Sequence, residues 1–252
     1  MTVLITGATS GIGLACAKLF AKNKYNIVIT GRRIERLNSI KNQLEKEFGV
    51  VVTSLNFDIQ NQVEVKNAIN NLKNNNINVD VLINNAGLAA GLSTIQNGEL
   101  KHWESMIDTN VKGLLYITKE ISNWMIEQKT FGHIINIGSI AGKEVYPNGN
   151  VYCATKHAVD ALNKAMRIDL LPYNIKVSSV NPGMVETEFS IVRFDGDIDR
   201  AKKVYEGIVP LKPEDIAETV FWIFNRPAHV NINDVVIMPT AQANSTINIR
   251  KN

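Results

Sequence analysis

The amino-acid sequence predicts an α/β protein built on one doubly wound parallel sheet. Short β-branched segments alternate with segments of helical periodicity along the whole chain. Several of the short segments are apolar on both faces, as in strands that helices cover on each side. The 252 residues, 45% of them apolar, suffice for the core of one such domain over 1–252.

The first half of the chain provides four of the expected strands. Runs of β-branched and apolar residues predict strands over 2–6, 26–30, 50–57 and 79–84. Apolar residues at helical spacing predict helices from residue 12, over 34–48 and over 61–74. A run of three asparagines from Asn74 marks the end of the third helix.

The second half continues the alternation. Strands are expected over 133–138, 175–181 and 235–238. Helices are expected over 97–128 in two pieces, over 150–171 and from Pro213, where Glu214 and Asp215 suit the first turn. Residues 187–207 read as a mixed, partly helical insertion. The polar tail 240–252 is expected to be loose or to dock on a partner subunit.

Composition excludes several classes of protein. The net charge of +3 includes no block of lysine and arginine, so we expect no nucleic-acid partner. No apolar run is long enough to cross a membrane. Cys16 and Cys153 cannot form a disulfide framework, and the four histidines lack metal-ligand spacing. Without a signal peptide, the chain reads as a reduced cytoplasmic protein with no metal.

The turn after the first strand has the features of a dinucleotide phosphate site. Small residues there let the backbone turn tightly and aim helix N–H groups at a pyrophosphate. The spacing is G-x-x-x-G-x-G. The cofactor-binding residues predicted in this turn are Gly7, Thr9, Ser10, Gly11, Ile12 and Gly13.

The end of the second strand predicts which dinucleotide binds. Sheets that bind NAD carry an acidic residue there, about 20 positions after the glycine turn, for the ribose 2′-hydroxyl. This chain has Arg32 and Arg33 instead. A guanidinium binds a 2′-phosphate through charge-assisted hydrogen bonds. We therefore expect NADP(H), with Arg32 gripping the phosphate and Arg33 adding charge or stacking on adenine.

Three polar side chains predict alcohol and carbonyl chemistry. Ser139 follows a strand, and Tyr152 and Lys156 lie four residues apart on the next helix, so they share a face. Hydride transfer to or from an alcohol carbon requires that the hydroxyl proton move as well. A phenol serves this purpose when its pKa is lowered, and a neighbouring ammonium and an oxidised nicotinamide both favour the phenolate. We therefore expect the pKa of Tyr152 to be lowered.

Together these residues resemble the short-chain dehydrogenase/reductase family. The resemblance includes the glycine turn, Asn84-Asn85-Ala86-Gly87, Pro182-Gly183 and the serine, tyrosine and lysine above. It implies a Rossmann-like sheet of about seven strands and a nicotinamide cofactor. It also implies the catalytic residues Asn110, Ser139, Tyr152 and Lys156. Further cofactor-binding residues implied are Asp58, Ile59, Asn85, Ala86, Gly87, Tyr152, Lys156, Pro182, Gly183, Val185 and Thr187.

In those implied roles, Tyr152 is the acid/base and Ser139 holds the substrate oxygen. Lys156 binds the nicotinamide ribose and lowers the Tyr152 pKa. Asn110 supports a water relay, and Asp58 contacts adenine. By the same resemblance, the long helices pair across a two-fold axis in a homotetramer.

Within the family, the sequence is most similar to NADP-dependent 3-hydroxy acid dehydrogenases of the serine type. Segments such as 30–37, 146–152 and 226–233 support this. Such a substrate needs a cation, and Arg193 is the candidate beside Ser139 and Tyr152; an ordinary ion pair with Asp195 is the alternative. The alternative functions are a 3-oxoacyl-carrier-protein reductase, a broad carbonyl reductase and a non-catalytic NADP(H) sensor.

Overall fold

A computed structural model describes residues 1–251. Its sheet has seven parallel strands in the order β3-β2-β1-β4-β5-β6-β7. The strands are β1 (Thr2–Ile5), β2 (Asn26–Gly31), β3 (Val52–Asn56), β4 (Val81–Asn84), β5 (His133–Ile137), β6 (Lys176–Pro182) and β7 (Asp234–Ile237). The helices are α1 (Gly11–Lys22), α2 (Ile34–Phe48), α3 (Gln62–Asn74), α4 (Leu100–Ile107), α5 (Leu114–Glu127), α6 (Asn150–Leu170), α7 (Phe189–Arg193), α8 (Ile198–Lys203) and α9 (Pro213–Phe224).

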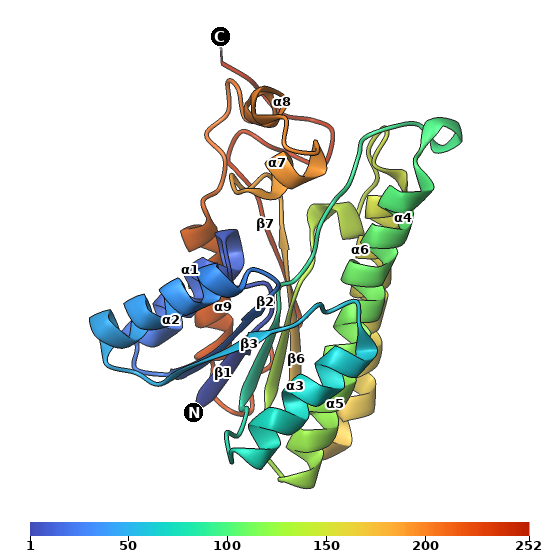
Figure 1. Cartoon of the computed structure of the whole chain (residues 1–252). Coiled ribbons are helices and arrows are strands. Elements are labelled where there is room, and N and C mark those ends of the chain that lie inside the picture. The colour runs from blue at the N-terminus through green and yellow to red at the C-terminus, as the bar shows by residue number, and fades with distance from the viewer. Residues whose placement is uncertain (252) are drawn as a thin grey trace.

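Helices cover both faces of the sheet, which confirms the predicted fold class (Figure 1). Successive strand residues point to opposite faces. Val3 and Ile5 of β1 pack in the layer with α1, α2 and α9. Leu4, between them, packs in the layer with α3, α5 and α6. All three side chains are fully buried, which explains why the strand is apolar on both faces.

Local signals explain where several helices begin and end. The side chain of Asn61 accepts hydrogen bonds from the N–H groups of Val63 and Glu64 and caps α3. Gly49, with φ of 65°, ends α2 in the left-handed conformation that glycine adopts easily. Pro213 opens α9, as the sequence predicts.

The predicted helical region 97–128 contains two α-helices, α4 and α5, as expected. A 3-10 turn (Ile95–Asn97) precedes α4, and a π-helical segment (Asp108–Gly113) separates α4 from α5. The extra residue in a π turn rotates the side chains that follow it. Asn110 lies in that segment, where it is buried against the loop after β4.

The tail differs from the loose segment the composition suggests. Gln242 is buried, and its side-chain oxygen accepts a hydrogen bond from the N–H of Met184, 2.9 Å away. Arg250 donates to the carbonyl oxygens of Val204 and Glu206. The described part of the tail therefore packs on its own chain, beside the partly helical insertion that contains α7 and α8.

The strand order reverses between the neighbouring strands β1 and β4. In such sheets, ligands bind at the carboxyl ends of the strands next to this point. In Figure 1 the insertion with α7 and α8 lies beyond that edge, away from the N-terminus. Among residues 1–251, no helix is both long enough and apolar enough to span a membrane.

Candidate active site

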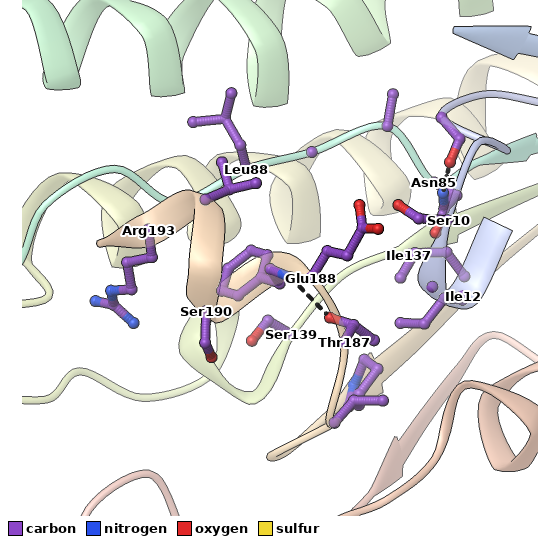
Figure 2. A pocket seen from close by; sticks show the side chains of 18 of the residues that line it. Ser10, Ile12, Asn85, Leu88, Ile137, Ser139, Thr187, Glu188, Ser190 and Arg193 are labelled. Carbon is purple, nitrogen blue, oxygen red and sulfur yellow. Dashed lines mark hydrogen bonds between the residues drawn. The ribbon is translucent and has the colours of Figure 1, made fainter. Parts of the chain in front are cut away.

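A cavity of about 560 Å³ lies along the carboxyl edge of the sheet. Figure 2 shows Arg193 and Leu88 toward one end, Ser139 between, and Ser10, Ile12 and Asn85 toward the other. The predicted site residues line this cavity, with two exceptions: Gly13 packs inside the turn, and Asn110 lies behind the wall. Residues from six strand ends are thus brought together.

The glycine turn is constrained by the backbone. Gly7 and Gly11 have φ values of 65° and 52°, in the left-handed region. A Cβ at Gly13 would lie 2.5 Å from the carbonyl oxygen of Gly7. The side chain of Ser10 does not cap α1, so the first N–H groups of this helix stay available to an anion. The turn therefore fits a dinucleotide pyrophosphate.

Two asparagines support the loops that form the cavity wall. Asn85 donates from Nδ2 to the carbonyl oxygens of Thr6 and Gly7, at 2.9 and 3.1 Å. Asn110 accepts a hydrogen bond from the N–H of Leu88 and donates to its carbonyl oxygen, and it also donates to Thr155. Both N–H donors of Asn110 are thus satisfied by the chain itself.

Lys156 is a buried amine with spare hydrogen-bonding capacity. Its Nζ donates to the carbonyl oxygen of Ile137 at 2.9 Å, and the residue is only 7% exposed. An ammonium has three N–H donors, and within residues 1–251 this carbonyl takes one of them. Burial lowers the pKa of Lys156 to about 8. Such a group fits the hydroxyls of a nicotinamide ribose.

The pKa of Tyr152 differs from the prediction. Burial raises it above the usual value of a phenol, while the nearby Ser139 hydroxyl and Arg193 oppose this rise. The ring packs edge-on against Phe189, with centroids 5.6 Å apart. The predicted lowering is therefore not produced by the chain alone, because removal of water outweighs the neighbouring polar groups. In the structure Tyr152 is a neutral phenol, the form that can donate a proton.

The two arginines after β2 have different surroundings. Nη1 of Arg32 lies 3.6 Å from Oδ2 of Asp58, and the arginine side chain is 63% exposed. Arg33 lies over the glycine turn, where it donates to the hydroxyls of Thr9 and Ser10. It also donates to Glu188. The sequence predicts that Arg32 is the main partner of the 2′-phosphate, whereas in the structure Arg33 is the arginine held beside the glycine turn.

Arg193 extends into the end of the cavity that contains Tyr152. It donates to the hydroxyl of Tyr146 at 3.0 Å, and its guanidinium lies 5.7 Å from the centre of the Tyr152 ring. The alternative ion pair with Asp195 is absent from the described residues, since that carboxylate lies 3.7 Å from His102 instead. The cation is therefore held beside the phenol.

Several lining residues were not predicted as part of the site. Glu188 and Phe189 lie in a segment without helical or strand periodicity. Tyr146 belongs to the segment 146–152 that supports the family resemblance, but that segment gives Tyr146 no role of its own. The tail residues that line the cavity are Gln242, Ser245 and Asn248. They reach it only through contacts across the fold, so no local pattern in the sequence identifies them.

The fold and this arrangement define the class of protein. A profile of the short chain dehydrogenase family matches residues 1–196, and the chain belongs to this family.

Individual relatives narrow the comparison. The chain is 43% identical over 252 residues to the NADP-dependent 3-hydroxy acid dehydrogenase YdfG of Salmonella typhi, and the match covers both chains completely. It is 40% identical over 242 residues to the serine 3-dehydrogenase of Rhizobium radiobacter, covering 96% of this chain and 95% of that protein. A solved structure described as the closed form of serine dehydrogenase complexed with NADP+ matches with a TM-score of 0.92 and 41% identity over the full length of both chains.

Proposed function

We propose that this protein is an NADP(H)-dependent oxidoreductase acting on the alcohol or carbonyl carbon of small 3-hydroxy acids, such as serine or 3-hydroxypropionate. One observation carries the proposal. A buried phenol, a buried amine and a guanidinium meet in one cavity: Tyr152, Lys156 and Arg193. The first two suit proton and hydride chemistry at a carbon–oxygen bond, and the third suits a carboxylate. The similarity to hydroxy acid dehydrogenases supports the same function.

The proposed cofactor site runs along the carboxyl edge of the sheet. N–H groups at the start of α1 would face the pyrophosphate, and the other N–H donors of Lys156 would bind the nicotinamide ribose. Asp58 and Ile59 would lie at the adenine end, and Val185 and Thr187 on the carboxamide and diphosphate side. When bound, the nicotinamide ring gives or takes the hydride.

In the proposed mechanism, the chain's residues orient the substrate and move its proton. The hydroxyl of Ser139 holds the substrate oxygen. In reduction, the Tyr152 phenol donates its proton to that oxygen as the alcohol forms, and in oxidation the phenolate takes the proton back. The burial that keeps the phenol neutral favours its role as donor. Asn110 acts from behind the wall, where it supports the proposed water relay through the loop at Leu88.

Arg193 is the proposed partner of the substrate carboxylate. A guanidinium binds a carboxylate through two parallel hydrogen bonds. The Tyr146 hydroxyl and the carbonyl oxygen of Gly91 hold the Arg193 side chain in place. The reacting carbon of a 3-hydroxy acid lies two bonds from its carboxyl carbon, so a cation beside Tyr152 suits a short substrate.

The test is a screen with purified protein that follows NADPH absorbance. The substrates are serine, 3-hydroxypropionate, 3-hydroxyisobutyrate, their oxo forms, an uncharged alcohol and an acetoacetyl thioester. We expect the highest kcat/KM with a small hydroxy acid. A preference for the thioester would favour the carrier-protein reductase, and equal rates with uncharged carbonyls would favour a broad carbonyl reductase.

Cofactor choice is tested separately. We expect the wild type to have a higher kcat/KM with NADP(H) than with NAD(H). Where NAD-binding sheets carry an acidic residue that would repel a 2′-phosphate, this chain has Arg32 and Arg33. Arg32→Asp should shift the preference toward NAD(H). A wild type that prefers NAD(H) would contradict the cofactor assignment.

We further propose that residues 1–252 act as one domain that assembles into a homotetramer in the cytoplasm. Large apolar side chains on the outer helices support assembly: Leu115 on α5 is 39% exposed and Ile168 on α6 is 73% exposed. Free thiols at Cys16 and Cys153 are consistent with a reducing compartment. Light scattering at micromolar concentration tests the tetramer, and a monomer there would contradict it.

A further inference from the structure

One carboxylate ties the segment after β6 to the start of α2. Glu188 directly precedes α7. Its Oε2 accepts a hydrogen bond from Nη1 of Arg33 at 2.9 Å, and its Oε1 accepts one from Nη1 of Arg36 at 2.7 Å. Each of the three side chains is between 40% and 49% exposed, so the bridge is open to an incoming solute.

The other nitrogens of Arg33 are also engaged. Nε and Nη2 donate to the hydroxyl of Thr9 at 3.1 and 2.7 Å, and Nη2 donates to the hydroxyl of Ser10 at 3.0 Å. The guanidinium therefore lies over the glycine turn, and Glu188 occupies its remaining nitrogen. Figure 2 shows the Glu188 side chain directed toward the Ser10 end of the cavity.

Glu188 is charged at neutral pH. Partial burial alone would raise the pKa of its carboxyl group, but the hydrogen bonds from Arg33 and Arg36 outweigh this and hold the pKa below its usual value. An anion thus already sits on the arginines. By contrast, Arg32 lies 3.6 Å from its carboxylate partner, Asp58, and is more exposed.

We propose that Glu188 is a specificity-determining residue that competes with the 2′-phosphate of the cofactor for Arg33. The inference rests on the NADP preference proposed above. Glu188 holds Nη1 of Arg33, the one nitrogen of this guanidinium that the hydroxyls of the glycine turn leave open, so a phosphate that binds Nη1 must take the place of the carboxylate. A dinucleotide with a 2′-phosphate must displace Glu188, whereas one without it need not. Glu188 therefore weakens the binding of NADP(H) but not that of NAD(H). The preference of the wild type for NADP(H) over NAD(H) is smaller as a result.

Binding calorimetry at fixed ionic strength tests the competition without any turnover. The ligands are NADP+, NAD+, adenosine 2′,5′-bisphosphate and 5′-AMP. Glu188→Gln removes the charge but keeps the shape of the side chain. The matched control is Glu186→Gln, which removes the same charge two residues earlier, from an exposed side chain that makes no hydrogen bond among the described residues.

We expect Glu188→Gln to lower the Kd of NADP+ and of the bisphosphate by roughly three- to fivefold, the upper part of the range for an exposed charge pair. The Kd values of NAD+ and 5′-AMP should stay within about twofold, and the control should leave all four within about twofold of the wild type.

An unchanged or raised Kd for the 2′-phosphorylated ligands would overturn the inference. Equal tightening by the control would also overturn it, because the effect would then come from net charge. Failure of the proposed cofactor preference has a different signature, in which the wild type binds NAD+ more tightly than NADP+. In that case, the effect of Glu188→Gln on the Kd values of adenosine 2′,5′-bisphosphate and 5′-AMP still shows whether Glu188 and a 2′-phosphate compete.

Discussion

The two sides of the cavity are built in different ways. We call the strand ends with Ser139, the π-helical segment with Asn110 and the helix α6 the floor. Residues 183–211 with 241–251 are the roof. In the floor, Lys156 and Asn110 are 7% and 2% exposed and are held against sheet and loop backbone. In the roof, Tyr205 donates to the carbonyl oxygen of Val185, and Gln242 accepts from the N–H of Met184.

This difference suggests that the floor carries the residues for the reaction and the roof carries those that select the substrate. The floor is fixed by the hydrogen bonds of a parallel sheet, so its groups stay in place whatever the substrate is. The roof is joined by individual polar contacts between segments far apart in sequence, and such segments open more easily. We expect floor variants to change turnover and roof variants to change substrate affinity.

The largest effect is expected at Tyr152. Tyr152→Phe keeps the ring against Phe189 and removes the proton donor, so kcat should fall by about 10²–10⁴-fold. The Kd of NADP+ should change little. Steady-state kinetics and calorimetry check both values, with Tyr173→Phe as the control, because it removes a phenol hydroxyl from an exposed side chain outside the cavity. Turnover close to that of the wild type would remove Tyr152 from its role.

A smaller effect, on KM, is expected in the roof. Arg193→Ala removes the proposed carboxylate partner, so KM for 3-hydroxy acids should rise by about 10–100-fold, the value of a charged hydrogen bond. KM for an uncharged alcohol should change little. Kinetics with both substrates distinguish lost recognition from a collapsed roof, which would affect the two equally. An unchanged KM for the acids contradicts the assignment.

The smallest effect concerns stability, and it depends on pH. Moving the pKa of Lys156 from 10.5 to about 8 corresponds to about 3 kcal/mol against the folded charged form. This penalty is complete below pH 8 and disappears as pH rises toward 10.5. Lys156→Met loses the bond to Ile137, so at pH 7 we expect a net gain of roughly 1–2 kcal/mol and a Tm higher by roughly 2–8 °C.

Thermal unfolding at pH 7 and pH 10 checks this expectation. The advantage of Lys156→Met should shrink or reverse at the higher pH. Lys164→Met, on the exposed side of the same helix, is the control and should show no such trend. If Lys156→Met is less stable than the wild type at pH 7, the buried amine of Lys156 does not destabilise the folded state.

The sequence predicts the floor better than the roof for a physical reason. Alternating strands and helices, the glycine turn and the spacing of Tyr152 and Lys156 are local patterns, and the structure brings these residues to one cavity. Glu188 and Gln242 act through partners more than 50 residues away, as with Arg33 and Met184. In the chain alone the pKa of Tyr152 is raised, because burial depends on the complete fold, whereas the predicted lowering includes the effect of an oxidised nicotinamide.

The aromatic contacts between α1 and α9 have a consequence for how the chain is made. Phe20 lies 5.1 Å from Phe221 and 5.2 Å from Phe224, measured between ring centres, and these residues belong to one core layer. Synthesis adds residues at about 5–20 per second, so α1 waits on the order of 10–40 s for the helix that covers it. During that interval the apolar face of α1 lacks the cover that α9 provides in the complete fold.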